Sequence, residues 1–198
     1  MKERPILFNT EMVKAILDGR KTQTRRLLKK QPIDVLPMKV PDMWVTLETR
    51  DPNHGRVIRC RYGVPHDRLW VRETWAHDDM DCKDVGCGNR DHIWWKANET
   101  KIVADSFAGD AHWRPSIHMP RWASRITLEI VNIRVERVQE ISGDQCTLEG
   151  IQVAWSDPNN SMQEKMAFKA LWDSINAKRG YGWDVNPWVW VIEFKRVK

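Results

Sequence analysis

The strongest constraint on the fold is an alternation of apolar and polar residues that runs from Ile126 to Val138. A period of two over this length is typical of a β-strand with one buried face, and such a strand needs neighbours in a sheet. A second alternating segment runs from Trp188 to Phe194. The sequence therefore predicts a sheet that contains both strands. The faces are expected to be Ile126, Leu128 and Ile130 against Thr127, Glu129 and Val131 in the first strand, and Trp188, Trp190, Ile192 and Phe194 against Val189, Val191 and Glu193 in the second.

Two helix signals lie between these strands. Ser142 and Gln145 match a capping box, which predicts a short helix that runs to Glu149 and stops at Gly150. A second capping pattern at Ser161 precedes the apolar stripe of a longer helix. The carboxylate of Glu149 is therefore expected at a defined helix end.

The N-terminal region predicts a short buried strand at residues 5–9 followed by a helix. Thr10 is the expected N-cap of this helix, and Gly19 suits the left-handed conformation that closes a helix. The segment that contains Pro32, Pro37 and Pro41 loses its period and is predicted to be a loop.

The central part of the chain predicts strands at residues 56–62 and 68–74. From His77 to about Pro120 the composition shifts toward Asp, Gly and His, and Ile93–Ala97 is expected to form one strand of a hairpin. We interpret residues 77–120 as an insertion within a single domain that spans residues 1–198.

A basic run directly follows the first predicted helix, from Gly19 to Arg26. It combines four cations and two hydroxyls, and its arginines offer planar forks that suit phosphate or carboxylate. A solvated basic turn is the simpler interpretation of such a run taken alone. The run Gly-Arg-Lys-Thr-x-Thr-x-Arg behind a short helix resembles the signature of the ASCH domain family, and further segments resemble its longer, phage- or prophage-type members: Leu69–Glu73, Met119–Ile126, Glu149–Ile151 and Asn186–Val191.

This resemblance implies an α+β fold, a small PUA-like mixed β-barrel with flanking short helices and the large insertion. Where the family usually has a Gly-Asp turn, this chain has His66-Asp67, which affects turn geometry rather than chemistry. The insertion is expected to cover one mouth of the barrel and to act as a wall or lid. Its Trp94, Trp95 and Trp113 are candidates for stacking on bases, with burial against the barrel as the alternative.

The resemblance also implies a catalytic trio, because Lys21, Thr24 and Glu149 match the proposed catalytic residues of small ASCH amidohydrolases that act on N4-acetylcytidine. A lysine with a lowered pKa can take the proton of a threonine hydroxyl, which attacks an amide carbonyl while a carboxyl group protonates the leaving amine. In a regular strand, residues three apart face opposite ways, so the trio requires a bulge or turn at Thr22-Gln23. The alternative is that these residues only bind phosphate and form local ion pairs.

Substrate or nucleic-acid binding is expected from Arg20, Arg25 and Arg26, with Arg121, Trp122, Ser124 and Arg125 as further candidates at the same mouth. Lys29 and Lys30 extend the basic cluster, and Arg56, Arg59 and Arg61 are expected on an adjacent strand. The chain carries 32 Lys plus Arg against 27 Asp plus Glu, so its net charge of +5 is compatible with a polyanionic partner. RNA is favoured over DNA because PUA-like barrels resemble RNA-modification modules.

The 12 tryptophans pack the core or stack on bases.

No cofactor or metal is expected. The segment around Cys82, Cys87 and His92 invites a zinc interpretation, but structural zinc sites bring thiolates in pairs two to four residues apart. The sparse cysteines predict reduced thiols, and the absence of a long apolar stretch predicts a cytoplasmic protein that does not enter a membrane. Motifs for nucleoside triphosphate hydrolysis and serine-esterase chemistry are not present.

The sequence thus predicts a metal-independent hydrolase that acts on RNA or a modified nucleoside. A non-catalytic RNA-binding module from the same superfamily is the alternative, and an ASCH-type ribonuclease is a third outcome.

Overall fold

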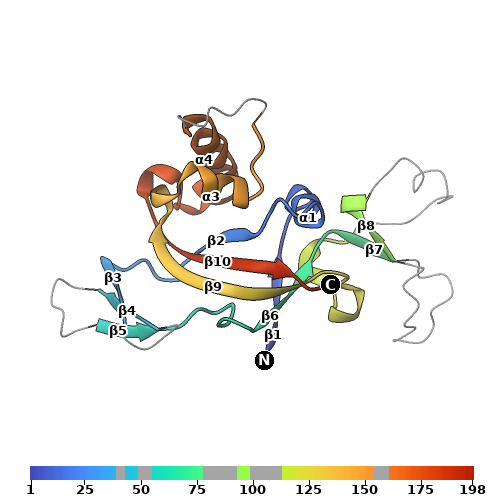
Figure 1. The fold of residues 1–198 in the computed structure, drawn as a ribbon, viewed down its shortest axis with the longest axis horizontal. Helices are drawn as coiled ribbons and strands as arrows, with labels where there is room; N and C mark the ends of the chain where they lie inside the picture. The colour runs from blue at the N-terminus through green and yellow to red at the C-terminus, as the bar shows by residue number, and fades with distance from the viewer. Residues whose placement is uncertain (39–42, 49–54, 78–92, 99–112, 154–160) are drawn as a thin grey trace.

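A computed structural model of the chain describes residues 1–38, 43–48, 55–77, 93–98, 113–153 and 161–198. Its centre is a five-stranded sheet of order β1-β6-β9-β10-β2 (Figure 1). The β1–β6 pair is parallel and the other pairs are antiparallel. The strands are β1 (Glu3–Leu7), β2 (Gln23–Leu27), β6 (Arg68–Arg72), β9 (Thr127–Arg137) and β10 (Trp188–Arg196).

Strand β10 lies inside this sheet, and its two faces enter different apolar clusters. Trp190, Ile192 and Phe194 pack in the larger cluster, together with residues of helix α1 (Thr10–Leu17). Val189 and Val191 pack in a smaller cluster under α3 (Gly143–Leu148) and α4 (Met162–Asn176). The predicted alternation of this strand is confirmed, and both faces are buried because helices supply a second layer.

A smaller three-stranded sheet lies at one end of the molecule (Figure 1). It consists of β3 (Asp34–Pro37), β4 (Trp44–Leu47) and β5 (Gly55–Ile58). The prediction of a loop around Pro32 and Pro37 is wrong here, while Pro41 lies outside the described residues. Pro37 is tolerated because it ends an edge strand. Trp44 secures the sheet by packing edge-on against Trp190, with ring centroids 4.9 Å apart.

A two-stranded hairpin of β7 (Trp75–His77) and β8 (Ile93–Trp95) lies at the opposite end of the main sheet (Figure 1). It confirms the strand expected at the start of Ile93–Ala97, although Lys96 already begins a 3-10 turn. Most of the predicted insertion lies outside the described residues. Single 3-10 turns connect the elements: Lys96–Asn98, Ser116–His118, Arg121–Ala123, Val138–Glu140, Ala177–Arg179 and Trp183–Val185.

Some of the helix caps in the structure are those predicted from the sequence, and others differ. The capping box is confirmed, since Gln145 N donates to Ser142 Oγ at 3.3 Å and Ser142 N donates to Gln145 Oε1 at 3.2 Å. The N-cap of α1 is Asn9 rather than Thr10, because the Asn9 side chain accepts from Met12 N. Ser161 precedes α4 as predicted, but its side chain makes no capping hydrogen bond.

The prediction of a mixed α+β fold is confirmed. Within the described ranges, the strands form open sheets rather than a closed barrel. The predicted strand at residues 56–62 ends at Ile58, and Tyr62 lies in a turn. None of the helices that the structure describes combines the length and apolarity needed to cross a bilayer.

Candidate active site

Lys21 is positioned by the chain reversal that follows helix α1. Gly19 adopts the expected left-handed conformation, with φ of +74°. The backbone N–H groups of Arg20 and Lys21 then both donate to the carbonyl of Ala15 at 2.9 Å. Lys21 therefore precedes β2, which begins at Gln23, and is not part of the strand.

Glu149 meets Lys21 from helix α3. As the C-cap of that helix, Glu149 is fixed by its backbone N–H, which donates to the carbonyls of Gln145 and Cys146. The Lys21 ammonium donates to the Glu149 carboxylate Oε2 at 2.8 Å and to the Glu149 carbonyl oxygen at 2.6 Å. Both side chains are almost completely buried. The short Glu-Gly match in the sequence thus identified the residue that pairs with Lys21.

Arg25 completes a buried network of charges on the other side of Glu149. Its guanidinium donates to Glu149 Oε1 at 3.2 Å, to Glu136 Oε2 at 3.1 Å and to Gln145 Oε1 at 2.7 Å. Glu149 therefore has two cationic partners, one on each carboxylate oxygen. Arg25 is occupied inside the protein and is not placed to contact a nucleic-acid backbone.

The surroundings of Lys21 change its protonation. Burial lowers the pKa of Lys21 below its ordinary value of 10.5, and the Glu149 carboxylate opposes this shift. The Phe8 ring lies 5.8 Å from the Lys21 Nζ atom, so one side of the ammonium faces an apolar surface. A low-dielectric pair of this kind can pass its proton from amine to carboxylate, which yields a neutral base beside a neutral acid.

Thr24 contributes to the cavity that Glu149 also lines. It lies in β2 opposite Ile192, and it is buried. The nearby thiol of Cys146 is not a competing nucleophile, because burial raises the pKa of Cys146 to about 11 and keeps it protonated at neutral pH.

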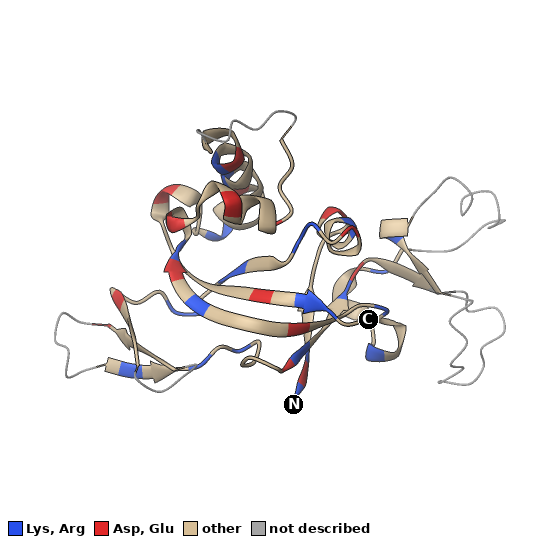
Figure 2. Cartoon of the chain, viewed as in Figure 1, with Lys and Arg blue, Asp and Glu red and all other residues tan. Residues whose placement is uncertain are grey.

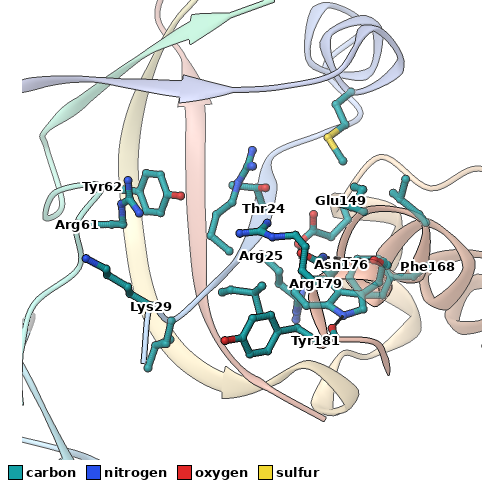
Figure 3. A pocket seen from close by; sticks show the side chains of 17 residues that line it. Thr24, Arg25, Lys29, Arg61, Tyr62, Glu149, Phe168, Asn176, Arg179 and Tyr181 are labelled. Carbon is teal, nitrogen blue, oxygen red and sulfur yellow. Dashed lines mark hydrogen bonds and ion pairs between the residues drawn. The ribbon is translucent and has the colours of Figure 1, made fainter. Parts of the chain in front are cut away.

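The cavity that Thr24 and Glu149 line has a volume of about 290 Å³. In Figure 3, Lys29, Arg61 and Tyr62 lie on one side, residues of α4 and its C-terminal end lie on the other, and Thr24 and Arg25 lie between them. This volume is near the lower limit for pockets that bind small ligands. Aromatic and cationic side chains line much of it: Tyr62, Phe168, Trp172 and Tyr181, and Arg25, Arg26, Lys29, Arg61 and Arg179.

Sequence analysis missed part of this lining. Phe168 and Trp172 belong to the apolar stripe of the helix predicted after Ser161, which is typical of core residues. Both are buried, but they also form a wall of the cavity. Tyr181 and Arg179 follow α4 and carry no signal in the sequence. Only the packing of α4 against α3 brings them to the site.

The remaining residues of the basic run are only partly available. Arg20 donates to Asp18 at 2.8 Å and is partly exposed. Arg26 lines the cavity, donates to the Leu7 carbonyl at 2.6 Å and lies 4.9 Å from the Phe8 ring centroid. Burial also lowers the pKa of Arg26. The run is therefore largely internal, rather than an exposed phosphate-binding surface.

The four predicted binding residues between Arg121 and Arg125 lie elsewhere, beside the β7–β8 hairpin, and none lines this cavity. Arg125 forms two 3.0 Å hydrogen bonds with Glu73, and Ser124 donates to a backbone carbonyl of β6. Arg121 pairs with Glu3 at 3.0 Å, and Trp122 packs against Trp75.

The described part of the insertion does not cover the cavity. Trp94, Trp95 and Trp113 are absent from its lining. Trp95 donates to the Ala123 carbonyl at 3.1 Å, and Lys96 lies over the Trp113 ring. Residues 78–92, which include Cys82, Cys87 and His92, lie outside the described residues. In the ranges that are described, no three His, Cys, Asp or Glu side chains gather as a metal site would require.

Gly150 sets the distance between helix α3 and the Lys21 side chain. Its φ is +88°, and a Cβ atom there would lie 2.9 Å from Ala15 Cβ and 3.2 Å from Lys21 Cβ. We expect Gly150→Ala to lower the free energy of unfolding by about 3 kcal/mol, because left-handed strain adds to overpacking. Chemical denaturation measures this change.

The matched control is Gly180→Ala. Gly180 has a similar φ of +80°, but nothing lies within 4 Å of the position of its Cβ. This variant should lose only the strain, about 1–2 kcal/mol. Equal losses in the two variants would show that the close approach to Lys21 has no energetic importance.

Comparison of this chain with models of protein families, with curated proteins and with solved structures gave no match. The case for a function therefore depends on the geometry of the residues described above.

Proposed function

We propose that this chain is an ASCH-type, PUA-like protein that hydrolyses the amide bond of an acylated amino group on a nucleobase, without a metal ion. Three groups carry the proposal. The Thr24 hydroxyl and the Glu149 carboxylate line one cavity as nucleophile and acid, and Lys21, which does not line the cavity, is the base that is ion-paired with Glu149. Burial of the pair and the lowered pKa of Lys21 support it.

The proposed reaction uses these three groups in sequence. Proton transfer from Lys21 to Glu149 produces a neutral amine, which takes the proton of the Thr24 hydroxyl as its oxygen attacks the amide carbonyl. The tetrahedral intermediate collapses when Glu149 protonates the leaving amino group of the base. Lys21 then passes its proton back to Glu149, and as a neutral amine it activates a water that cleaves the Thr24 ester. The carboxylic acid is released as Glu149 donates its proton to the Thr24 oxygen, which restores the Lys21 ammonium and the Glu149 carboxylate.

The cavity walls suit a nucleobase. Tyr62, Phe168 and Tyr181 offer aromatic surfaces, and stacking on a base contributes about 1–3 kcal/mol. We place this activity in the cytoplasm, where the free thiols of Cys60 and Cys146 would remain reduced.

A second candidate is a binding module without catalysis. It is favoured by the two strong hydrogen bonds that Lys21 already makes to Glu149, which a purely structural ion pair would also make. In this case the cavity would bind a base, and the buried charges would only hold β2 against α3.

Incubation with N4-acetylcytidine separates these candidates. We expect the protein to release acetate and cytidine at a rate that a chelator does not change. Thr24→Val, which removes the hydroxyl and keeps the shape, should slow release by roughly 100-fold or more. Thr24→Ser should retain measurable activity because it keeps a nucleophilic oxygen.

Two other outcomes would replace the proposal. Binding of cytidine derivatives without acetate release would favour the binding module. Cleavage of a single-stranded RNA that is lost in Thr24→Val would instead indicate a ribonuclease.

A further inference from the structure

A second, larger groove lies beside the cavity of the candidate active site. Its volume is about 920 Å³, and Leu28, Lys29 and Arg61 line both spaces. The groove runs between the segment after β2 and strand β5 of the small sheet. An elongated ligand in the groove would therefore lie next to the cavity.

The groove is strongly basic. Figure 2 shows Lys and Arg along the segments that connect the small sheet with the main sheet. Glu48 is the only acidic residue among the described residues of the lining. Exposed cations dominate the lining and form no ion pair with any described carboxylate: Lys29, Lys30, Arg56, Arg59 and Arg61.

These cations contrast with those of the basic run. Arg25 is neutralised by Glu149 and Glu136 inside the protein. Among the described residues the groove cations have no such partner, so an external polyanion can displace their counterions with a gain in free energy. A set of exposed, uncompensated cations along one groove fits repeated phosphates better than a single carboxylate.

The walls of the groove are held in place before any ligand binds. The Gln31 side chain donates to the carbonyls of Leu28 and Trp188 at 3.0 Å and accepts from Trp188 N at 2.7 Å. On the opposite wall, the Thr46 hydroxyl donates to the Arg56 carbonyl at 3.1 Å. Both cationic segments are thus attached to sheets, which reduces the entropy lost on binding.

We propose that this groove binds the sugar-phosphate backbone of a single-stranded polynucleotide and that one base of the strand enters the adjoining cavity. The substrate is then a modified base within a strand, rather than only a free nucleoside, and this part rests on the proposed function. A single strand is favoured over a duplex because a base must leave its stack to reach a cavity of about 290 Å³.

The test uses a variant of three groove residues that do not line the cavity: Lys30→Ala, Arg56→Ala and Arg59→Ala together. Binding is followed by the fluorescence anisotropy of a labelled RNA of about 12 nucleotides. We expect about tenfold weaker binding at about 50 mM salt. The slope of log K against the logarithm of the salt concentration should become shallower by about 2, because each of the three lost phosphate contacts contributes roughly 0.7 to it.

The control removes three exposed charges that line neither space: Lys14→Ala, Lys178→Ala and Lys198→Ala. It changes the net charge equally and should leave affinity and slope as in the wild type. Equal weakening in both triple variants would overturn the inference, because total charge rather than the groove would then govern binding. Parallel titrations with single-stranded DNA and duplex RNA identify the polymer, and tighter binding of the duplex would also overturn it.

Hydrolysis separates this inference from the proposed function. In the groove variant, kcat/KM for an acetylated oligonucleotide should fall at least tenfold more than kcat/KM for N4-acetylcytidine. Equal losses on the two substrates would overturn the inference while leaving the hydrolase intact. If neither substrate is hydrolysed, the proposed function fails, and the change in salt slope alone decides whether the groove binds a strand.

Discussion

Lys21→Met is expected to reduce amide hydrolysis by roughly 10²–10⁴-fold, the usual contribution of a positioned acid or base. The variant should stay folded, because Met keeps the apolar stem beside Phe8 and Glu149 keeps Arg25 as its ion-pair partner. Its catalytic loss should appear in kcat rather than in KM, since Lys21 is buried behind the cavity and does not line it.

The pH profile of the wild-type enzyme tests the same assignment. Because burial lowers the pKa of Lys21, a larger share of the amine is neutral below pH 10.5 than in an exposed lysine. In the proposed reaction Lys21 and Glu149 share one proton, which finally goes to the leaving amine, so activity should fall as pH rises through the lowered pKa of Lys21. This limb should be missing from the residual activity of Lys21→Met.

Lys178→Met is the matched control, because Lys178 is exposed and lies outside both the cavity and the groove. It should change neither the rate nor the pH profile. A Lys21→Met variant with wild-type activity would exclude Lys21 as the base and leave the ion pair with a structural role.

Glu149→Gln is expected to lower the free energy of unfolding by about 3–5 kcal/mol near pH 6, because it leaves the buried charges of Lys21 and Arg25 without their shared counter-ion. Thermal or chemical unfolding measures the loss. The change is nearly isosteric, so packing contributes little to it.

The loss should depend on pH in a defined direction. A lysine whose folded pKa lies below its ordinary value destabilises the protein while it is protonated, and this cost is relieved as pH rises from the folded pKa toward 10.5. Glu149 raises the pKa of Lys21, so its removal moves the start of this window to lower pH. Glu149→Gln should therefore recover stability relative to the wild type as the solution becomes alkaline.

Glu3→Gln breaks the exposed pair with Arg121 and is the control for the loss of one carboxylate. It should cost no more than about 1 kcal/mol, because solvent screens exposed pairs. A similar loss in both variants would mean that burial of the Lys21–Glu149–Arg25 network has little energetic weight.

The sequence identified local structure where local interactions decide it. The period of β9 and β10, the capping box at Ser142 and the left-handed Gly19 follow from patterns within a few residues. Strands β3 and β4 were missed because contacts far away in the sequence stabilise them, such as Trp44 on Trp190.

For the candidate site, the sequence supplied the residue types, and the tertiary structure determined which side chains contact one another. The run from Gly19 to Arg26 supplied the lysine and the hydroxyl, and the capping box placed Glu149 at a helix end. Only folding separated the buried Arg25 from the exposed Arg56 and Arg59, although all three are equally basic in the sequence. Burial depends on which elements pack over a side chain, and that depends on pairings across more than 100 residues, such as Arg25 with Glu149.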